Sequence, residues 1–402
     1  MLHPVGCNKC TRYSNGNVQA AIADDRCWPY ARHVLSAKNR PLEVEFVFEL
    51  VKELTELPGP TGHEDAVQDW IERRWGEFAQ DVRRTRVNNI LARVGGTGPR
   101  LLLVAHADEI CLMVKSVTEE GFLHLWPYYS DQLGRPPRWF TPLNQPALVL
   151  SSAGAVPGVF ATASGHVVGG RNSQKEQFEW NDWFVDIGVR SCGDVESLGI
   201  GPGARVIWNP ETRRIGSNIT GKAMDDRAAL AIATAVGEKL AASEELPFDF
   251  WLASTVQEEN GLLGAASLAD EMSFDYAIAL DVGLTGDIPG PDKRDFPSCL
   301  GAGPVVVYQD ARCHYSRRLS DRLIDIAKSQ PIPIPVQRAV FQNYGSDGAE
   351  LLRRGVETAL LTYPTRYTHS PIETVDEADL IHTADLLIAF VLSGEQRLGA
   401  TL

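Results

Sequence analysis

The stretch LLLVAHADE, residues 101–109, decides the fold. Its continuous apolar run, Leu101 to Ala105, predicts a strand buried on both faces, as in the parallel centre of an α/β sheet. His106 and Asp108 follow directly where this strand ends. Ligands bind at the carboxyl ends of strands in open α/β sheets. The stretch therefore predicts an α/β fold and a functional site at the end of this strand.

Four further segments offer metal-binding or proton-transferring side chains near the ends of predicted strands or the starts of predicted helices. Singly, each segment has an ordinary interpretation as a helix cap, a turn or a solvated surface pair. Their joint occurrence, with two His and several carboxylates, is typical of a hydrolase that uses two metal ions. The segments are Met224-Asp225-Asp226-Arg227, Gln257-Glu258-Glu259, Leu280-Asp281-Val282-Gly283 and Thr368-His369-Ser370.

Two ions about 3.5–4 Å apart need about five ligating side chains, one of them a carboxylate between both ions. His with carboxylates favours zinc, cobalt or manganese over magnesium or calcium, and zinc is our first choice. We predict Asp225 as the shared carboxylate, because it enters a helix in the middle of the set. Asp226 remains the alternative bridge, or a partner of Arg227. The predicted metal ligands are His106, Asp225, Glu259, Asp281 and His369.

The adjacent carboxylates Glu258 and Glu259 suit a division between general base and ligand. A general base must reach the attacking water without being held by a metal ion itself. Consecutive residues near a strand end point in different directions, so Glu259 can bind an ion while Glu258 faces the water. We predict that Glu258 takes the proton of a metal-activated water and passes it to the leaving amine. Asp108 is predicted to hydrogen-bond the ring of His106 or to orient a ligand.

The hydrophobic pattern of the middle of the chain differs from that of the segments before and after it. Residues 43–57 are apolar at helical spacing, and Thr61 is the predicted N-cap of the next helix. Between residues 115 and 215, short β-rich pieces alternate with loops, which predicts an inserted small β-barrel domain. The predicted catalytic domain comprises residues 41–114 and 216–402.

Residues 1–40 show no clean period, and we predict a poorly ordered N-terminal extension, such as an over-long gene start would add. Cys7-Asn8-Lys9-Cys10 has zinc-ribbon spacing, but no second Cys-x-x-Cys follows at the expected distance. We therefore interpret this pair as incidental.

Composition excludes several function classes. The chain of 402 residues carries 52 acidic and 38 basic residues, a net charge of −14, which argues against nucleic acid or an anionic membrane surface as the main partner. No apolar run approaches the roughly 20 residues of a membrane span, and no signal peptide is visible. Seven scattered Cys are typical of reduced thiols. We predict a cytoplasmic protein, and its acidic balance is compatible with chemistry on small molecules or short peptides.

As a set, these segments resemble the signature blocks of the M42 family of metalloaminopeptidases, the glutamyl/deblocking and tetrahedral aminopeptidase group. The resemblance covers about residues 43 to 395, with the blocks in the family's order. The blocks are Ala105–Ile110, Gly221–Arg227, Val256–Ala265, Asp281–Val282 and Arg366–Glu373, with weaker similarity at Val185–Gly188, Leu198–Gly203 and Tyr344–Asp347.

The resemblance implies a mixed-sheet α/β/α peptidase domain with an inserted β-barrel. It implies His106, bridging Asp225 and Asp281 as ligands of one ion, and Asp225, Glu259 and His369 as ligands of the other. Glu258 matches the family's general base and Asp108 its orienting Asp. Family members commonly form tetrahedral shells of twelve subunits that trim peptides from the N-terminus, so the resemblance implies a homo-oligomer, in the fullest case a dodecamer.

Two other functions remain open. A related dinuclear metal deacylase or amidohydrolase would need a cation for a free carboxylate, and Arg366 beside His369 is the candidate. We favour instead a salt bridge between Arg366 and Glu373. A non-catalytic scaffold on the same fold would be expected to lack a ligand or the base, whereas all are present.

Overall fold

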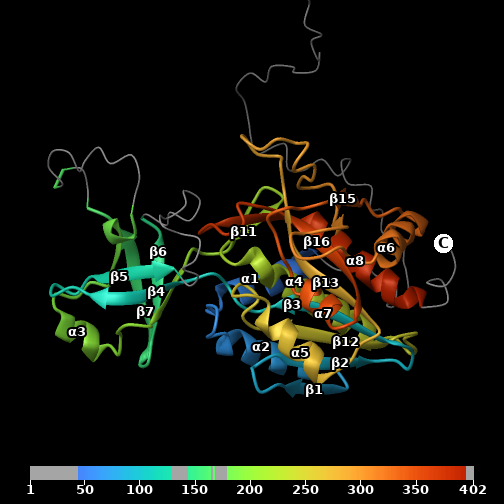
Figure 1. Ribbon diagram of the computed structural model, residues 1–402, viewed down its shortest axis with the longest axis horizontal. Helices are drawn as coiled ribbons and strands as arrows, with labels where there is room; N and C mark the ends of the chain where they lie inside the picture. The colour runs from blue at the N-terminus through green and yellow to red at the C-terminus, as the bar shows by residue number, and fades with distance from the viewer. Residues whose placement is uncertain (1–43, 128–143, 164–165, 168–178, 395–402) are drawn as a thin grey trace, which may run out of the picture. The chain divides into compact units, whose positions relative to one another are not determined.

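The computed structural model describes residues 44–127, 144–163, 166–167 and 179–394 (Figure 1). The predicted N-terminal extension, including the pair Cys7 and Cys10, lies outside the described residues. The described helices are α1 (Val44–Glu56), α2 (Asp65–Gly76), α3 (Cys192–Ser197), α4 (Met224–Ala241), α5 (Leu263–Glu271), α6 (Arg317–Ser329), α7 (Gly348–Arg353), α8 (Glu377–Ser393) and the 3-10 helix η5 (Trp180–Asp182).

A mixed sheet of 11 strands forms the centre of the catalytic part, in the order β1-β2-β12-β3-β13-β16-β17-β11-β10 with β14 and β15 attached beside β16. Its central strands β12, β3, β13 and β16 are mutually parallel. The strands are β1 (Asp81–Arg84), β2 (Ile90–Gly95), β3 (Arg100–His106), β10 (Arg213–Ile215), β11 (Asn218–Gly221), β12 (Asp249–Thr255), β13 (Tyr276–Leu284), β14 (Val305–Val307), β15 (Gln337–Ala339), β16 (Glu357–Arg366) and β17 (Glu373–Asp376).

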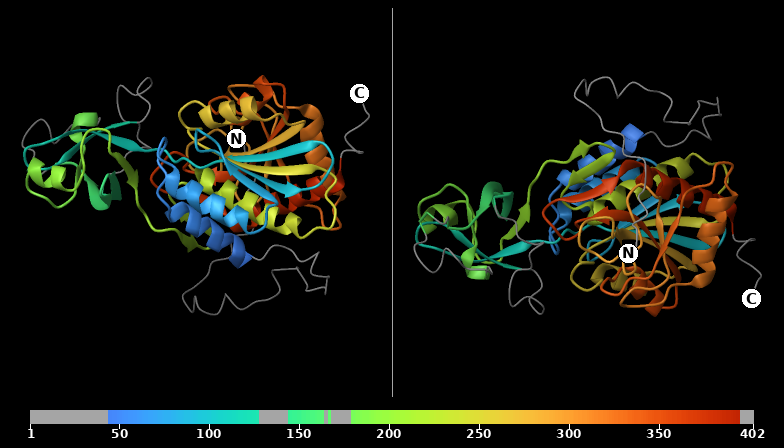
Figure 2. Two further views of the ribbon diagram at one scale, coloured as in Figure 1. Left: turned by 90° about the horizontal axis from the view of Figure 1, so that it is seen from below. Right: turned by 90° about the horizontal axis from the view of Figure 1, so that it is seen from above.

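Helices cover both faces of this sheet (Figure 2). Because strand residues alternate between faces, β3 divides its apolar side chains between two cores. Leu101 and Leu103 belong to the core that includes α1, α2, α4, α6 and α8, whereas Leu102 and Val104 belong to the core that includes α5 and α7. The predicted mixed-sheet α/β/α arrangement is confirmed.

Helix α4 is buried on nearly all sides, from Met224 to Gly237 without interruption. Its run of small residues, including Ala228, Ala229 and Ala231, is fully buried and lets the helix pack between the sheet and α1 and α8. A helix that is apolar on every side is a core helix rather than a surface one. Its first turn consequently holds Asp225 inside the protein.

The middle region forms a closed barrel of six strands in the order β4-β5-β8-β7-β6-β9. Alternate residues of its strands fill the interior, among them Val114, Leu125, Phe160 and Val185. The predicted inserted β-barrel is therefore present, while its boundaries at residues 115 and 215 stay a prediction. The strands are β4 (Leu112–Val117), β5 (Leu123–Pro127), β6 (Pro146–Ser151), β7 (Gly154–Ala161), β8 (Phe184–Asp186) and β9 (Arg205–Trp208).

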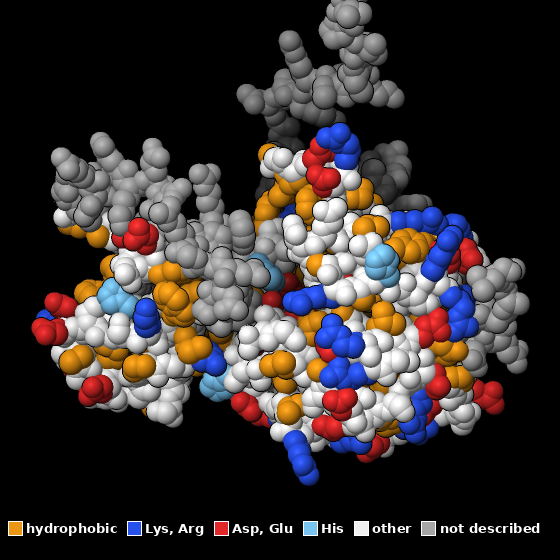
Figure 3. Space-filling model, in the orientation of Figure 1, with side chains coloured by type: hydrophobic (Ala, Val, Ile, Leu, Met, Phe, Trp, Pro, Cys, Tyr) orange, Lys and Arg blue, Asp and Glu red, His pale blue; other side chains and the backbone are white. Residues whose placement is uncertain are grey.

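On the face shown in Figure 3, Lys and Arg side chains lie among Asp and Glu side chains. Such interspersed charge is typical of a solvated surface. Over the described ranges, no helix is long and apolar enough to cross a membrane.

Candidate metal centre

The predicted ligands converge where the central parallel strands end. His106 is the last residue of β3 and pairs with Thr255 at the end of β12. Asp281 lies in β13, between β3 and β16, His369 follows β16, and Asp225 lies in the first turn of α4. Because parallel strands end at the same edge of a sheet, segments far apart in the sequence meet here.

Two overlapping sets of side chains could each hold a metal ion. Group 1 is His106, Asp225 and Asp281, and group 2 is Asp225, Glu259 and His369. Within each group the ligand atoms lie within 4.8 Å of one another. Asp225 belongs to both groups: its Oδ1 is 3.1 Å from His106 Nε2, and its Oδ2 is 3.5 Å from His369 Nε2. The structure thus brings together all five predicted ligands, with Asp225 in the middle.

The two groups differ in exposure. His106, Asp225 and Asp281 are all buried, whereas Glu259 and His369 are partly exposed as residues. The side chain of Glu259 is itself only 7% exposed, so the difference between the groups rests on His369. The side chain of His106 is 2% exposed and that of His369 is 37% exposed. Group 1 therefore lies deeper in the protein, and group 2 lies toward solvent.

Asp108 connects His106 to the turn after β12. Its Oδ1 is 3.4 Å from His106 Nδ1, and its carboxylate accepts the backbone N–H groups of Glu258 (2.9 Å) and Glu259 (3.2 Å). Since Nδ1 of His106 faces Asp108, Nε2 is left to face Asp225, an arrangement that suits a metal-binding His. Thr61 donates its hydroxyl to Asp108 Oδ2 (3.0 Å). The prediction of Thr61 as a helix cap is wrong, because Glu64 occupies the N-cap position of α2.

Glu258 and Glu259 point toward different His residues. Glu258 Oε2 is 3.9 Å from His106 Nε2, and Glu259 Oε2 is 3.2 Å from His369 Nε2. The turn begins at Gln257, which has a φ of 52° and donates its N–H to Glu64 Oε1 (3.1 Å). Consecutive N–H groups in such a turn form a concave anion site, here filled by the carboxylates of Glu64 and Asp108.

Asp226 lies in neither group. It accepts the N–H of His106 (3.2 Å) and the hydroxyl of Tyr363 (2.7 Å), and the Asp225–Asp226 peptide bond is cis. Arg227 does not turn to Asp226 but donates to the carbonyl oxygen of Ala107 (2.7 Å). Asp226 therefore connects β3 and β16 beside the ligands rather than between them.

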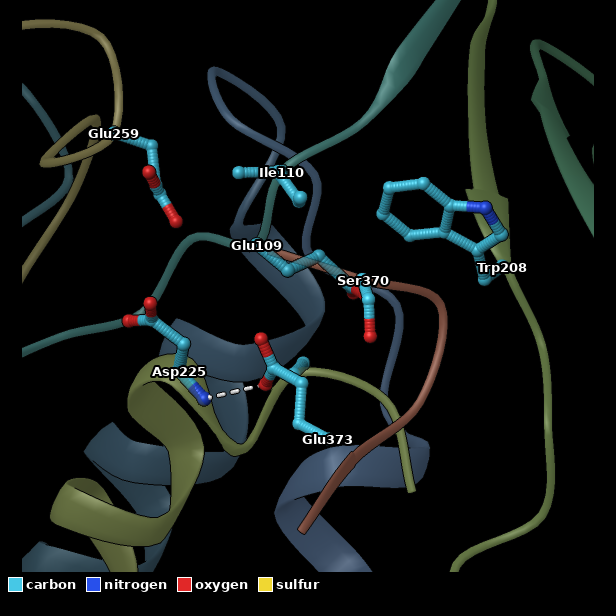
Figure 4. A pocket seen from close by; sticks show the side chains of 8 residues that line it. Glu109, Ile110, Trp208, Asp225, Glu259, Ser370 and Glu373 are labelled. Atoms are coloured by element: carbon cyan, nitrogen blue, oxygen red, sulfur yellow. Dashed lines mark hydrogen bonds between the residues drawn. The ribbon is translucent and has the colours of Figure 1, made fainter. Parts of the chain in front are cut away.

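Arg366 forms its ion pair with Asp287, at 2.5 Å between Nη2 and Oδ2. The predicted salt bridge from Arg366 to Glu373 is wrong. Glu373 instead accepts the backbone N–H groups of Asp225 (2.9 Å) and His369 (2.8 Å). Figure 4 shows its side chain facing Asp225 in a small pocket, which is lined by Glu109, Ile110, Trp208, Ala223, Asp225, Glu259, Ser370 and Glu373.

Sequence analysis missed the backbone-binding roles of Glu64, Glu373 and Asp226. A carboxylate that precedes a helix or follows a His looks the same whether it meets solvent or a backbone N–H. The contacts of Glu64 with Gln257, of Asp226 with His106 and of Glu373 with Asp225 join segments that are distant in sequence, so no local pattern could have revealed them. Only the contact of Glu373 with His369, four residues away, is local.

In the absence of a metal ion, burial and repulsion between carboxylates dominate the electrostatics of these side chains. Burial, with the charge of Asp225, raises the pKa of Asp281 to about 8. Burial likewise raises the pKa of Glu258 well above its usual range. Although burial opposes their charge, nearby carboxylates raise the pKa of His106 and of His369 well above the usual value. Asp225, despite its burial, has a lowered pKa because both His side chains hydrogen-bond to it.

The residues fit divalent cations. Imidazole nitrogens and carboxylates are the donors that zinc, cobalt and manganese accept, and buried carboxylates of like charge are costly without a counter-charge. The buried cation Lys222 cannot supply it, because its Nζ is 2.8 Å from both carboxylate oxygens of Glu109. Cations bound in group 1 and group 2 would replace the protons that these carboxylates otherwise retain.

The profile of the M42 glutamyl aminopeptidase family matches residues 88–386. This chain belongs to that family. The resemblance drawn from the signature blocks is confirmed, and the protein is a peptidase.

Other family members match along nearly their whole length. The lysyl aminopeptidase of Pyrococcus furiosus is 28% identical over 348 residues, which is 86% of this chain and 96% of that protein. The crystal structure of a TET aminopeptidase from Thaumarchaeota archaeon SCGC AB-539-E09 is 27% identical and covers 88% of this chain and 98% of its own, with a TM-score of 0.81. TET1 peptidase of Pyrococcus horikoshii, described as assembling into a tetrahedron or a large octahedral shell, is 27% identical and covers 86% of this chain and 99% of its own, with a TM-score of 0.75.

Proposed function

We propose that this protein is an aminopeptidase that hydrolyses N-terminal residues from short peptides and depends on two divalent metal ions. The observation that carries the proposal is the position of Asp225, whose two carboxylate oxygens face the Nε2 atoms of His106 and His369. A carboxylate shared in this way is what a two-ion hydrolase requires. Zinc is our first choice, with cobalt or manganese as alternatives.

We assign the groups as the resemblance implies. His106, Asp225 and Asp281 would hold one ion, and Asp225, Glu259 and His369 would hold the other. When bound, such ions activate a water molecule and polarise the peptide carbonyl.

Glu258 would act as the general base. Its side chain lies beside group 1 without belonging to either group, and its backbone is fixed by Asp108. A carboxylate with a raised pKa is suited to accept a proton from water and to pass it to the leaving amine. Asp108 would act by positioning His106 and the turn that carries Glu258.

The deacylase alternative is less well supported. It needs a cation free to bind a substrate carboxylate, and Arg366 is already paired with Asp287 through two hydrogen bonds, of 3.0 and 2.5 Å. The scaffold alternative is also disfavoured, since the five ligands and Glu258 meet at one place.

We further propose a homo-oligomer, with twelve subunits as the first expectation, because relatives of this size form shells. Light scattering on the eluting peak of a gel-filtration column tests this number. A cytoplasmic location is also proposed: Cys111, Cys192, Cys299 and Cys313, in the described ranges, are free thiols.

The function is tested with metal-reconstituted protein and two sets of peptides, one with free amino termini and one N-acetylated. We expect stepwise loss of N-terminal residues from the free peptides, seen by mass spectrometry and abolished by a chelator. Cleavage restricted to blocked peptides would establish the deacylase instead, and no cleavage with two ions bound would establish the scaffold.

Glu258→Gln tests the general base. We expect kcat to fall by about 10²–10⁴-fold with metal content unchanged. Glu271→Gln, which changes an exposed residue of α5, is the control. Wild-type turnover in Glu258→Gln would show that another group removes the proton.

A further inference from the structure

Glu373 is a buried carboxylate that touches the backbone of two predicted ligands. It is 3% exposed and is the first residue of β17, where it pairs with Gly221 of β11. Strand β11 leads directly into the turn that carries Asp225. The sheet therefore places Glu373 beside that turn through β11, and beside His369 through the chain that precedes β17.

Each carboxylate oxygen of Glu373 has one backbone partner. Oε2 accepts the N–H of Asp225 at 2.9 Å (Figure 4). Oε1 accepts the N–H of His369 at 2.8 Å. The backbone carbonyl oxygen of Glu373 accepts the hydroxyl of Thr220 at 3.1 Å. One side chain thus sets the separation between the backbones of Asp225 and His369, both members of group 2.

The segment that carries His369 needs such a contact. His369 has a φ of 60° and Tyr367 a φ of 64°, in the left-handed region that side chains other than Gly and Asn rarely adopt. Such conformations persist only where surrounding contacts determine them. The N–H of His369 has no strand partner, since His369 lies between β16 and β17, and the carboxylate of Glu373 is its acceptor.

Group 1 has different supports. His106 and Asp281 lie within β3 and β13, whose backbones are fixed by neighbouring strands. The N–H of His106 is bound by Asp226 rather than by Glu373. Glu373 holds two members of group 2, Asp225 and His369, but only the shared Asp225 of group 1. Removing its carboxylate should therefore disturb group 2 more than group 1.

We propose that Glu373 is a positioning residue for the metal ion of group 2, because its carboxylate fixes Asp225 and His369 at the separation that the ion requires. This inference rests on the proposed function, which supplies the ion. It assigns to Glu373 control over the affinity of one ion, and not a contact with substrate.

The test is Glu373→Gln. Its amide keeps one acceptor oxygen but turns an N–H₂ group toward a backbone N–H, which breaks one of the two contacts. Zn²⁺ binding to the full-length, metal-stripped protein is followed by calorimetry, and Co²⁺ binding by visible absorption. We expect one of the two binding events to weaken by about 10–100-fold, as for other groups that orient metal ligands, and the other event to weaken much less.

Asp379→Asn is the matched control. Asp379 is also a buried carboxylate that accepts two backbone N–H groups, those of Gly301 and Gly303, both at 2.7 Å, and it belongs to neither ion group. We expect this variant to lose thermal stability but to bind both ions as wild type does. Should Glu373→Gln fail to fold, Glu373→Asp, which keeps the charge but shortens the side chain, is measured in the same way.

Unchanged binding of both ions in the Glu373 variant would overturn the proposal. Equal weakening of both ions would also overturn it, and so would an equal loss of ion affinity in Asp379→Asn. Wild-type protein is measured first. If wild type itself binds fewer than two ions, the proposed function fails. If wild type binds two ions and cleaves peptides while the Glu373 variant binds them equally well, only the role of Glu373 fails.

Discussion

Group 1 and group 2 share Asp225 but rest on different kinds of structure. His106 and Asp281 project from β3 and β13, whose hydrogen-bond ladders determine where the ligands point. Glu259 and His369 lie in turns after β12 and β16, close to the positive φ angles of Gln257 and His369. The backbone of a candidate ligand on a central strand is held largely by the neighbouring strands. The backbone of a candidate ligand on a turn is held by carboxylate side chains, here Asp108 for Glu259 and Glu373 for His369.

The largest effect is expected at Asp225, the residue common to both groups. We expect Asp225→Ala to lose both ions, because each group then keeps only two side chains. Peptidase activity should fall by about 10³-fold or more, since two-ion stabilisation amounts to several kcal/mol. Metal content by mass spectrometry and turnover of a free-amino peptide are the measurements. Asp270→Asn, an exposed carboxylate on α5, is the control, and two tightly bound ions in Asp225→Ala would contradict the shared-ligand assignment.

Replacing each His in turn should distinguish the two groups. We expect His369→Ala to keep the ion of group 1 and so to bind one ion per chain. His106→Ala should lose the ion of group 1 and, because His106 is 2% exposed and His369 is 37% exposed, should also lower the melting temperature more. Ion stoichiometry and thermal unfolding of both variants check this order. If His369→Ala lowered the melting temperature more than His106→Ala, the turn that carries His369 would contribute more to stability than the end of β3.

The stability of the metal-stripped protein should depend on pH. Burial and Asp225 raise the pKa of Asp281 to about 8, and burial and Asp225 raise that of Glu373 to about 8. Between about pH 4, near the unfolded pKa of a carboxyl group, and pH 8, the folded state therefore binds more protons than the unfolded state. Its free energy of unfolding then falls as pH rises through this range.

Bound cations replace those protons, so the metal-loaded protein should lose less stability than the metal-stripped protein as the pH rises. We expect the difference in melting temperature between loaded and ion-free protein to widen by several degrees from pH 5 to pH 8. Thermal scans of both forms in matched buffers test this, and a difference that narrows over this range would contradict it.

The smallest effect is expected at Arg366, at the end of β16 before the turn with His369. Its ion pair with Asp287 is partly exposed, at 26% and 17% for the two side chains, and such pairs contribute about 0–1 kcal/mol. We expect Arg366→Met to keep cleavage of free-amino peptides within about threefold, a change of under about 1 kcal/mol. A large loss confined to blocked or carboxylate-bearing substrates would revive the deacylase function.

Much of the fold and of the candidate site was predictable from the sequence. The apolar run from Leu101 to Ala105 predicted a central strand, and β3 is one. The β-rich middle region predicted the barrel, since alternating strands between loops have few other ways to bury their apolar faces. The five candidate ligands could be picked out from the sequence because four of them end or follow a strand or begin a helix, and Asp281 lies in the last half of β13. Such positions meet at one edge of an α/β sheet.

The supports of those ligands were not predictable. Thr61 looked like a helix cap and binds Asp108 instead; Arg366 looked like the partner of Glu373 and binds Asp287. In both cases the sequence suggested a role within the local segment, whereas folding brings a partner from a distant segment within hydrogen-bonding distance.

Hydrophobic periodicity and side-chain chemistry are local properties of the chain, so the type of fold and the kinds of donor atom could be predicted from the sequence. Which oxygen faces which His, the greater exposure of His369, and the contacts of Glu373 with Asp225 and His369 follow only from the folded structure. These depend on contacts between segments far apart in sequence, and the geometry of such contacts is set by packing and strand register rather than by any local pattern.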